Sequence, residues 1–215
     1  IIVSLVGSEM CIRDRDGKAN YFEPIPLGGA IRGPSVARVI SSHLDGFAAG
    51  DLIFGLHHWE DYSLSDATTL LLSKLSPEED IPLSYYCGGL GGSGHTAYVG
   101  LHEIGNIQAG ETVLISAAAG ATGSMATQIA KLRGCKVVGI VGGDNKADLI
   151  TQKLGADAAI NYKTCGDLTI AINEACPEGV DVYFDNVGGK TLDAALQCMK
   201  TVSYTHLRAH ETHDD

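Results

Sequence analysis

This chain of 215 residues lacks features that define several classes of protein. No apolar run approaches the roughly 18 residues that a membrane-spanning helix needs, so we expect no membrane segment. Basic residues are few, since 15 Lys and Arg stand against 26 Asp and Glu, giving a formal net charge of −11. This acidity argues against binding to nucleic acid or to an anionic membrane surface.

The cysteines show neither metal-ligand spacing nor a disulfide framework. None are paired at Cys-x-x-Cys spacing, and five remain when Cys11 near the N-terminus is set aside. An odd number of unpaired cysteines is typical of a reducing compartment and argues against a structural zinc site. We therefore expect a cytoplasmic protein without a metal, in which Cys87 is a small buried apolar residue. We expect separate surface or packing roles for His57, His58 and His95, which have no partner at ligand spacing.

The two ends of the chain are related to each other at the level of DNA. With suitable codons, residues 5–14 and 202–211 are encoded by the two complementary strands of one DNA sequence. Unrelated segments of a natural protein would not show this relationship, and the DNA resembles a transposase sequencing adapter. We therefore interpret residues 1–15 and 202–215 as adapter-derived and exclude them from the fold prediction. The alternative is a native N-terminal strand and a native His-rich tail.

Residues 111–134 contain the most informative pattern in the chain. A short β-prone apolar run is followed by glycines and small residues, and then by a segment of helical periodicity. A strand, a glycine turn and a helix in this order form a cradle for pyrophosphate, because small residues let phosphates approach the N–H groups that begin the helix. The pattern Ala117-x-x-Gly120-x-x-Gly123 is a variant of the dinucleotide-binding fingerprint with alanine first.

The pattern of predicted secondary structure changes near residue 98. Before it, Gly and Pro separate short β-prone runs, which predict a compact β-barrel. After it, strands and helices alternate, which predicts a parallel sheet with right-handed crossover connections. The predicted strands are 35–41, 51–55 and 59–62 in the first part and 111–117, 136–142, 158–162 and 180–186 in the second, where the predicted helices end at Gly134 or span 145–154, 168–176 and 191–199.

The end of the strand 136–142 indicates which cofactor binds. NAD-binding folds usually carry an acidic residue about 20 positions after the glycine turn, where it binds the ribose 2′-hydroxyl. Here the strand ends in Gly142-Gly143 and Lys146 lies just beyond. The glycines leave room and an ammonium group pairs with phosphate, so we predict NADP rather than NAD. Asp144 is the competing residue, and we assign it to the N-cap of the next helix.

Several segments resemble the zinc-independent medium-chain dehydrogenases/reductases, in the branch of prostaglandin, alkenal double-bond and curcumin reductases. The resemblance extends over residues 16–201 and is carried by 50–62, 90–98, 114–124, 134–139, 161–163 and 183–189. It implies an α/β protein, with a partial GroES-like β-barrel domain over 16–97 and a truncated NADP-binding Rossmann domain, a doubly wound parallel sheet, over 98–201.

The activity that the resemblance implies is NADPH-dependent reduction of the C=C bond of α,β-unsaturated ketones and aldehydes. An NADPH quinone reductase and a non-catalytic nucleotide-binding relative are the alternatives. The family begins before residue 16 and continues past residue 201 with further strands, a catalytic-site tyrosine and a dimerisation edge. We therefore expect an inactive fragment, one that does not fold stably, of an enzyme that forms a homodimer. Gly92-Ser93 stands where the family has Met-Pro, which leaves the substrate preference open.

The resemblance also assigns roles to individual residues, although none is identified as the catalytic proton donor. Lys146 and Tyr162 would bind the 2′-phosphate, Asn186 would contact the cofactor near the switch point of the sheet, and Thr96 would lie beside the nicotinamide. The alternatives are packing of Tyr162 beside the sheet and capping of the next turn by Asn186. With the pyrophosphate-binding turn, the expected cofactor-binding residues are Ala117, Gly120, Ala121, Thr122, Gly123, Gly143, Lys146, Tyr162, Asn186 and Thr96.

Overall fold

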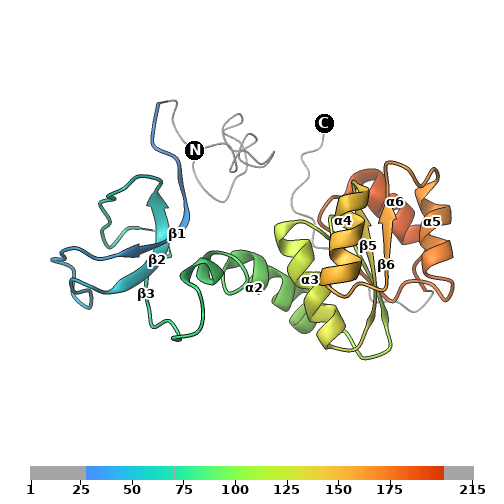
Figure 1. Cartoon of the computed structure of the whole chain (residues 1–215), viewed down its shortest axis with the longest axis horizontal. Helices are drawn as coiled ribbons and strands as arrows, with labels where there is room; N and C mark the ends of the chain where they lie inside the picture. Colours follow the sequence, from blue (N-terminus) through green and yellow to red (C-terminus); the bar gives the residue numbers. More distant parts are fainter. Residues whose placement is uncertain (1–27, 70, 201–215) are drawn as a thin grey trace. The chain divides into compact units, whose positions relative to one another are not determined.

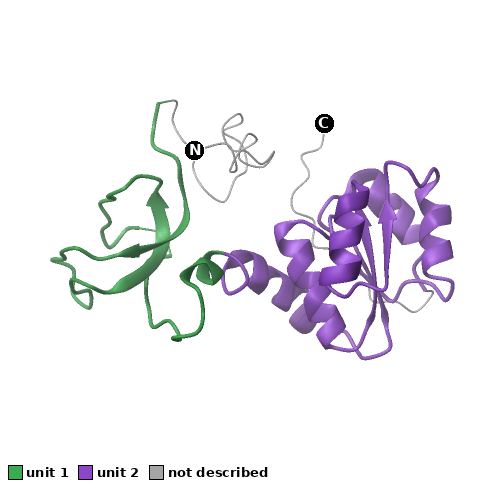
Figure 2. Cartoon of the chain, in the orientation of Figure 1, with its two compact units in different colours: residues 1–87 green, residues 88–215 purple. Residues whose placement is uncertain are grey.

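The structure is a computed structural model that describes residues 28–69 and 71–200. It divides into two units, residues 1–87 and 88–215, as Figure 2 shows. The division lies between Cys87 and Gly88, ahead of the predicted change at residue 98. The predictions for residues 1–15 and 202–215 lie outside the described residues.

Unit 1 contains a three-stranded antiparallel sheet in the order β1-β2-β3 (Figure 1). β1 spans Arg32–Arg38 and pairs with β2, Leu52–His58, in a register that places Val36 opposite Phe54. β3 is short, Ser73–Leu75, and a 3₁₀ turn, η1, follows at Leu83–Cys87. Buried and less buried residues alternate along β2, as expected for a strand with one face toward a core.

The predicted strand over 59–62 is wrong. The chain bends there, and Tyr62 is 78% exposed. The indole of Trp59 packs on the backbone of β1, because a Cβ placed on Gly33 would lie 3.1 Å from Trp59 Nε1. The N–H of Trp59 still donates to the carbonyl of Ile31 at 2.7 Å, and the chain turns away after it.

Unit 2 contains a four-stranded parallel sheet in the order β6-β5-β4-β7. From β4 the chain adds β5 and then β6 on one side, and it then returns to add β7 on the other side of β4. The switch point of this doubly wound sheet therefore lies between β4 and β7. All residues of β4 and β7 are buried, as expected for strands covered on both faces. The strands are β4 Thr112–Ile115, β5 Lys136–Val141, β6 Ala158–Asn161 and β7 Val182–Phe184.

Helices cover both faces of this sheet (Figure 1). Val113 and Ile115 of β4 belong to the core on the side of α2, α3 and η3, whereas Leu114 belongs to the core on the side of α5 and α6. The prediction of a partial GroES-like β domain followed by a parallel α/β domain is confirmed, and the sheet of the first part is antiparallel. The helices are α2 Gly92–Tyr98 with its π-helical continuation η2 Val99–Ile104, α3 Ala121–Leu132, α4 Asp144–Asp148 with η3 Leu149–Lys153, α5 Leu168–Ala175 and α6 Gly189–Gln197.

Among the described residues, none of the helices combines the length and the apolar character that crossing a membrane requires.

Candidate cofactor site

The turn between β4 and α3 has the geometry of an anion cradle. Ala117 adopts a left-handed conformation with φ 47°, and the N–H of Gly120 donates to the carbonyl of Ala117 at 2.8 Å. α3 begins at Ala121, with Gly120 as its N-cap and no side chain that caps it. The N–H groups of a first helical turn have no intrahelical acceptor, so those of Ala121, Thr122 and Gly123 can bind an anion.

The two glycines of the turn have different roles. A Cβ on Gly123 would lie 2.2 Å from the carbonyl oxygen of Ala117 and 2.8 Å from the Cα of Ala118, so only glycine lets α3 pack this closely on the turn. Gly120 is exposed, and a Cβ there would lie 3.1 Å from the same oxygen. Gly123 therefore serves helix packing, whereas Gly120 leaves the backbone open to a ligand.

Asn186 lies two positions after the end of β7, at the switch point, and is joined to the end of β4. Its backbone N–H donates to Ser116 Oγ at 2.7 Å, and its Nδ2 donates to the carbonyl of Ser116 at 2.8 Å. Because Ser116 precedes Ala117, these bonds place Asn186 next to the glycine turn. The alternative in which Asn186 caps the next turn is wrong, because the carboxylate of Asp185 accepts from Val187 N and Gly188 N.

Asp185 is the centre of a buried polar network that sequence reasoning missed. The residue is 7% exposed. Its Oδ1 accepts from Tyr183 Oη at 2.7 Å and from Ser116 Oγ at 3.0 Å. Burial raises the pKa of the Tyr183 phenol, and the adjacent carboxylate raises it further, so Tyr183 stays a donor. The available signal was the position of Ser116 and Asp185, each directly after a buried strand.

The predicted 2′-phosphate residues come from the segments that follow β5 and β6. The ring of Tyr162 packs on Gly142, where a Cβ would lie 2.9 Å from Tyr162 Cε1 and 3.0 Å from its Oη. Tyr162 is nevertheless 52% exposed, and its N–H donates to the carbonyl of Val141 at 3.0 Å. Lys146 is exposed on α4 and forms no ion pair within the part of the chain that the structure describes. Tyr162 thus packs beside the sheet and still presents its ring edge to solvent near Gly143.

The prediction that Asp144 is an N-cap is wrong. Gly143 occupies the N-cap, and no side chain caps α4. Asp144 is already the first helical residue, so its carboxylate is free to turn toward the neighbouring strand, where Oδ1 accepts from Asn161 Nδ2 at 2.7 Å.

Thr96 lies on α2 and is half-buried. α2 packs against α3, which places Thr96 in unit 2 with the other predicted residues. A Cβ on Gly94 would lie 1.6 Å from the carbonyl oxygen of Gly89, so this glycine is needed where the helix meets the preceding turn. Cys87 is exposed at the end of η1, contrary to the expectation of a buried residue, because that turn buries none of its residues.

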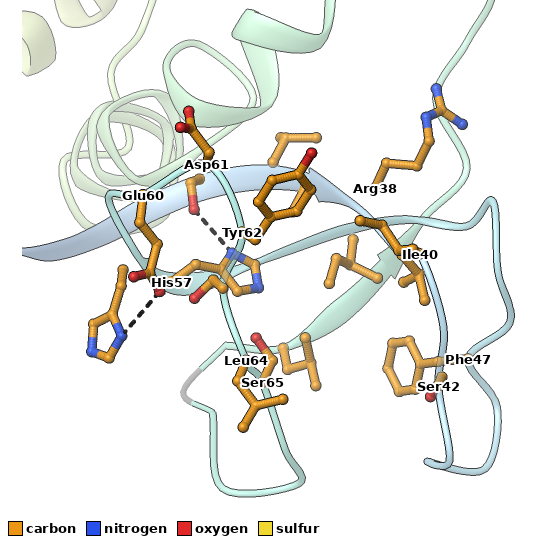
Figure 3. Close-up of a pocket in the computed structure, with 18 of the residues that line it drawn as sticks. Arg38, Ile40, Ser42, Phe47, His57, Glu60, Asp61, Tyr62, Leu64 and Ser65 are labelled. Atoms are coloured by element: carbon orange, nitrogen blue, oxygen red, sulfur yellow. Dashed lines mark hydrogen bonds and ion pairs between the residues drawn. The ribbon is translucent and has the colours of Figure 1, made fainter. Parts of the chain in front are cut away.

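The histidines are not gathered into one cluster. His57 is buried in β2 with Nδ1 2.9 Å from Ser35 Oγ, its Nε2 has no hydrogen-bond partner among the described residues, and burial lowers its pKa. Figure 3 shows it facing a hollow of about 750 Å³ in unit 1. His58 Nδ1 lies 3.5 Å from Glu60, and His95 is exposed on α2. Within residues 28–69 and 71–200, no group of three or more potential ligands is arranged to hold a metal ion.

Comparison with known proteins supports the interpretation of both units. The family model described as zinc-binding dehydrogenase matches residues 121–202, and the model described as N-terminal domain of oxidoreductase matches residues 6–72. The 2-alkenal reductase (NADP(+)-dependent) of Nicotiana tabacum is 46% identical over 188 residues, which is 87% of this chain and 54% of that protein. Prostaglandin reductase 1 of Mus musculus is 45% identical over 174 residues, 81% of this chain and 53% of that protein.

One solved structure that resembles this chain holds a bound cofactor. The crystal structure of CurA in complex with NADPH from Vibrio vulnificus has a TM-score of 0.79 at 35% identity and covers 93% of this chain and 58% of that chain. The chain therefore spans about half the length of the curated relatives it matches. It belongs to the medium-chain dehydrogenase/reductase superfamily. Within that superfamily, it belongs to the zinc-independent branch of prostaglandin, alkenal and curcumin reductases.

Proposed function

We propose that the protein reduces the C=C bond of α,β-unsaturated ketones and aldehydes with NADPH. The observation that carries this proposal is the 46% identity to an NADP(+)-dependent 2-alkenal reductase over a stretch that includes the whole glycine turn and the Gly142–Lys146 segment. The ammonium of Lys146, which is exposed and forms no ion pair within the described part of the chain, supports NADPH as the reductant, since it can pair with a 2′-phosphate.

Each predicted residue has a place in this proposal. Ala117 and the segment 120–123 form the turn that holds the pyrophosphate, which accepts from backbone N–H groups at the start of α3. Gly143 leaves room for the phosphorylated ribose, which Lys146 and Tyr162 bind. Asn186 donates its amide hydrogens to Ser116, so its Oδ1, which has no partner among the described residues, is left to accept from the nicotinamide half of the cofactor. Thr96 on α2 lies beside the nicotinamide.

When bound, NADPH supplies the hydride that is added to the β-carbon of the substrate. None of the described residues is assigned as the proton donor, and the roles proposed for them are to bind and orient the cofactor. The bonds of Ser116 and Asp185 hold the ends of β4 and β7 in a fixed arrangement before the cofactor arrives, which lowers the cost of ordering the site. We further propose that the protein is cytoplasmic and that it works as a homodimer.

The test uses a polypeptide that carries this sequence and extends over the full length of its relatives. NADPH oxidation is followed at fixed cofactor with an enal such as 4-hydroxynonenal and, in parallel, with benzoquinone. Saturable turnover of the enal with little turnover of the quinone supports the proposal. Preference for the quinone indicates the alternative quinone reductase, and NADPH binding without turnover of either indicates a non-catalytic relative.

A further inference from the structure

We propose that Asn161 is a specificity-determining residue that selects NADPH by holding the carboxylate of Asp144. This inference rests on the proposed NADPH site. Asp144 and Asp148 each lie two positions from Lys146, but only Asp144 directly follows the glycines at the end of β5, where the phosphorylated ribose is expected to bind. A carboxylate at such a place ordinarily accepts from the 2′-hydroxyl of NAD and repels a 2′-phosphate.

Asn161 is well placed to hold this carboxylate. It is the last residue of β6 and pairs with Val141, the last residue of β5, so both strands end at the same level. Its Nδ2 donates to Asp144 Oδ1 at 2.7 Å, and its Oδ1 accepts from the N–H of Lys163 at 3.2 Å. The amide oxygen and the amide nitrogen of Asn161 each have a hydrogen-bond partner. Because the oxygen must accept from Lys163 N–H, the NH₂ group faces Asp144.

The chemistry of this bond has two consequences for the cofactor. The neutral donor occupies one lone-pair direction of the carboxylate and fixes its rotamer, so Asp144 is less able to accept from the 2′-hydroxyl of NAD. The same bond draws the negative charge toward β6, which lessens its repulsion of a phosphate held by Lys146. Removal of the Asn161 amide would release a mobile carboxylate beside the glycines.

A purely structural role for Asn161 is the competing explanation. Its backbone carbonyl accepts from Thr164 N and Cys165 N at 3.0 Å, so the residue also begins the turn after β6. These backbone bonds survive substitution of the side chain. The two explanations therefore differ in one respect: only the carboxylate-holding role makes the effect of losing Asn161 depend on the charge of Asp144.

The experiment measures dissociation constants for NADPH and NADH, by calorimetry or by quenching of cofactor fluorescence, on the same full-length polypeptide that tests the proposed function. The variants are Asn161→Ala, Asp144→Asn and the double variant. Asp148→Asn combined with Asn161→Ala is the matched control, because Asp148 also lies on α4 but bonds Gln152. Because the charge of Asp144 is exposed, Asn161→Ala is expected to weaken the binding of NADPH only about three- to tenfold. The binding of NADH is expected to be unchanged or improved. Asp144→Asn restores the NADPH affinity of Asn161→Ala, and Asp148→Asn does not.

Two results would overturn the inference while leaving the proposed cofactor intact. The first is equal weakening of NADPH and NADH by Asn161→Ala, and the second is equal rescue by the two carboxylate substitutions. A wild-type chain that binds NADPH no better than NADH contradicts the proposed cofactor itself, and the inference with it.

Discussion

Asn186 and Ser116 are 70 positions apart in sequence and are joined by two hydrogen bonds, one from the backbone N–H of Asn186 and one from its Nδ2. The bonds connect the ends of β7 and β4 at the point where the order of the sheet reverses. Asn186 thereby becomes part of the same rigid unit as the glycine turn. The cofactor site that we propose depends on this connection, because the two halves of a dinucleotide bind on either side of it.

Ser116→Ala is expected to destabilise unit 2. The substitution removes the acceptor of Asn186 N–H and one donor to Asp185, which leaves buried polar groups without partners and costs about 1–3 kcal/mol of unfolding free energy. Urea denaturation measures the change. Ser124→Ala is the control, since the hydroxyl of Ser124 bonds a carbonyl in its own exposed helical turn. Equal stability of the two variants would show that the buried network contributes little.

Substitution of the two glycines of the turn is expected to separate packing from binding. Gly123→Ala forces a Cβ against backbone atoms that cannot move alone, so α3 must shift, and overpacking of this kind costs about 1–3 kcal/mol. Gly120→Ala meets a backbone oxygen at 3.1 Å and is expected to cost less stability while weakening NADPH at the exposed turn. Thermal melting with and without NADPH measures both effects. A larger loss of stability in Gly120→Ala than in Gly123→Ala would contradict the assigned roles.

The order of elements in unit 2 could be predicted from the sequence because each element carries its own local signal. The apolar strands, the glycines at 120 and 123 and the helical periodicity are all contained within a few turns of chain. The antiparallel first part was predicted on the same grounds. The strand at 59–62 failed because the packing of Trp59 on Gly33 is a contact between distant residues, which local β-propensity does not report.

The site was predicted less completely than the fold, for the same reason. The glycine turn and Lys146 follow from local pattern, but the bonds of Ser116 with Phe184, Asp185 and Asn186 depend on strands 68 to 70 positions apart lying side by side. Asp144 was assigned to a cap because N-capping is a local role. Its observed partner, Asn161, comes from another strand, and only the register of β5 and β6 brings the two together.

Tyr162→Phe and Tyr162→Ala are expected to distinguish binding from packing at this residue. Phe keeps the ring that lies on Gly142 and loses only the hydroxyl, so stability should be retained while NADPH binds several-fold more weakly, the worth of one hydrogen bond to a charged group. Ala also removes the packed ring and should lower the melting temperature. If Tyr162→Phe binds NADPH as the wild type does, the hydroxyl does not contact the cofactor.

Asp157→Asn is expected to make the free energy of unfolding less dependent on pH in the acidic range. Burial opposes ionisation of Asp157, but the hydrogen bonds from Lys131 Nζ and Val137 N outweigh it, and the pKa of the carboxyl is lowered. A lowered pKa in the folded state gives stability that is present near neutral pH and is lost as pH falls below about 4. Because the pair is partly exposed, we expect a loss of about 1 kcal/mol or less at pH 7 that disappears at low pH.

Denaturation at pH 7 and at pH 3 measures the loss caused by Asp157→Asn, with Asp148→Asn as an exposed control on α4. A difference between wild type and Asp157→Asn that stays constant across this range would show that the ionised carboxylate is not what stabilises the fold.

The measurement that tests the central claim most directly is the effect of Lys146→Ala on the dissociation constants of NADPH and NADH. A charged hydrogen bond to phosphate contributes about 1.5–3 kcal/mol, so the substitution should weaken NADPH about ten- to hundredfold. NADH, which has no 2′-phosphate, should bind as it does to the wild type. Equal losses for the two cofactors would contradict the assignment of this site to NADPH.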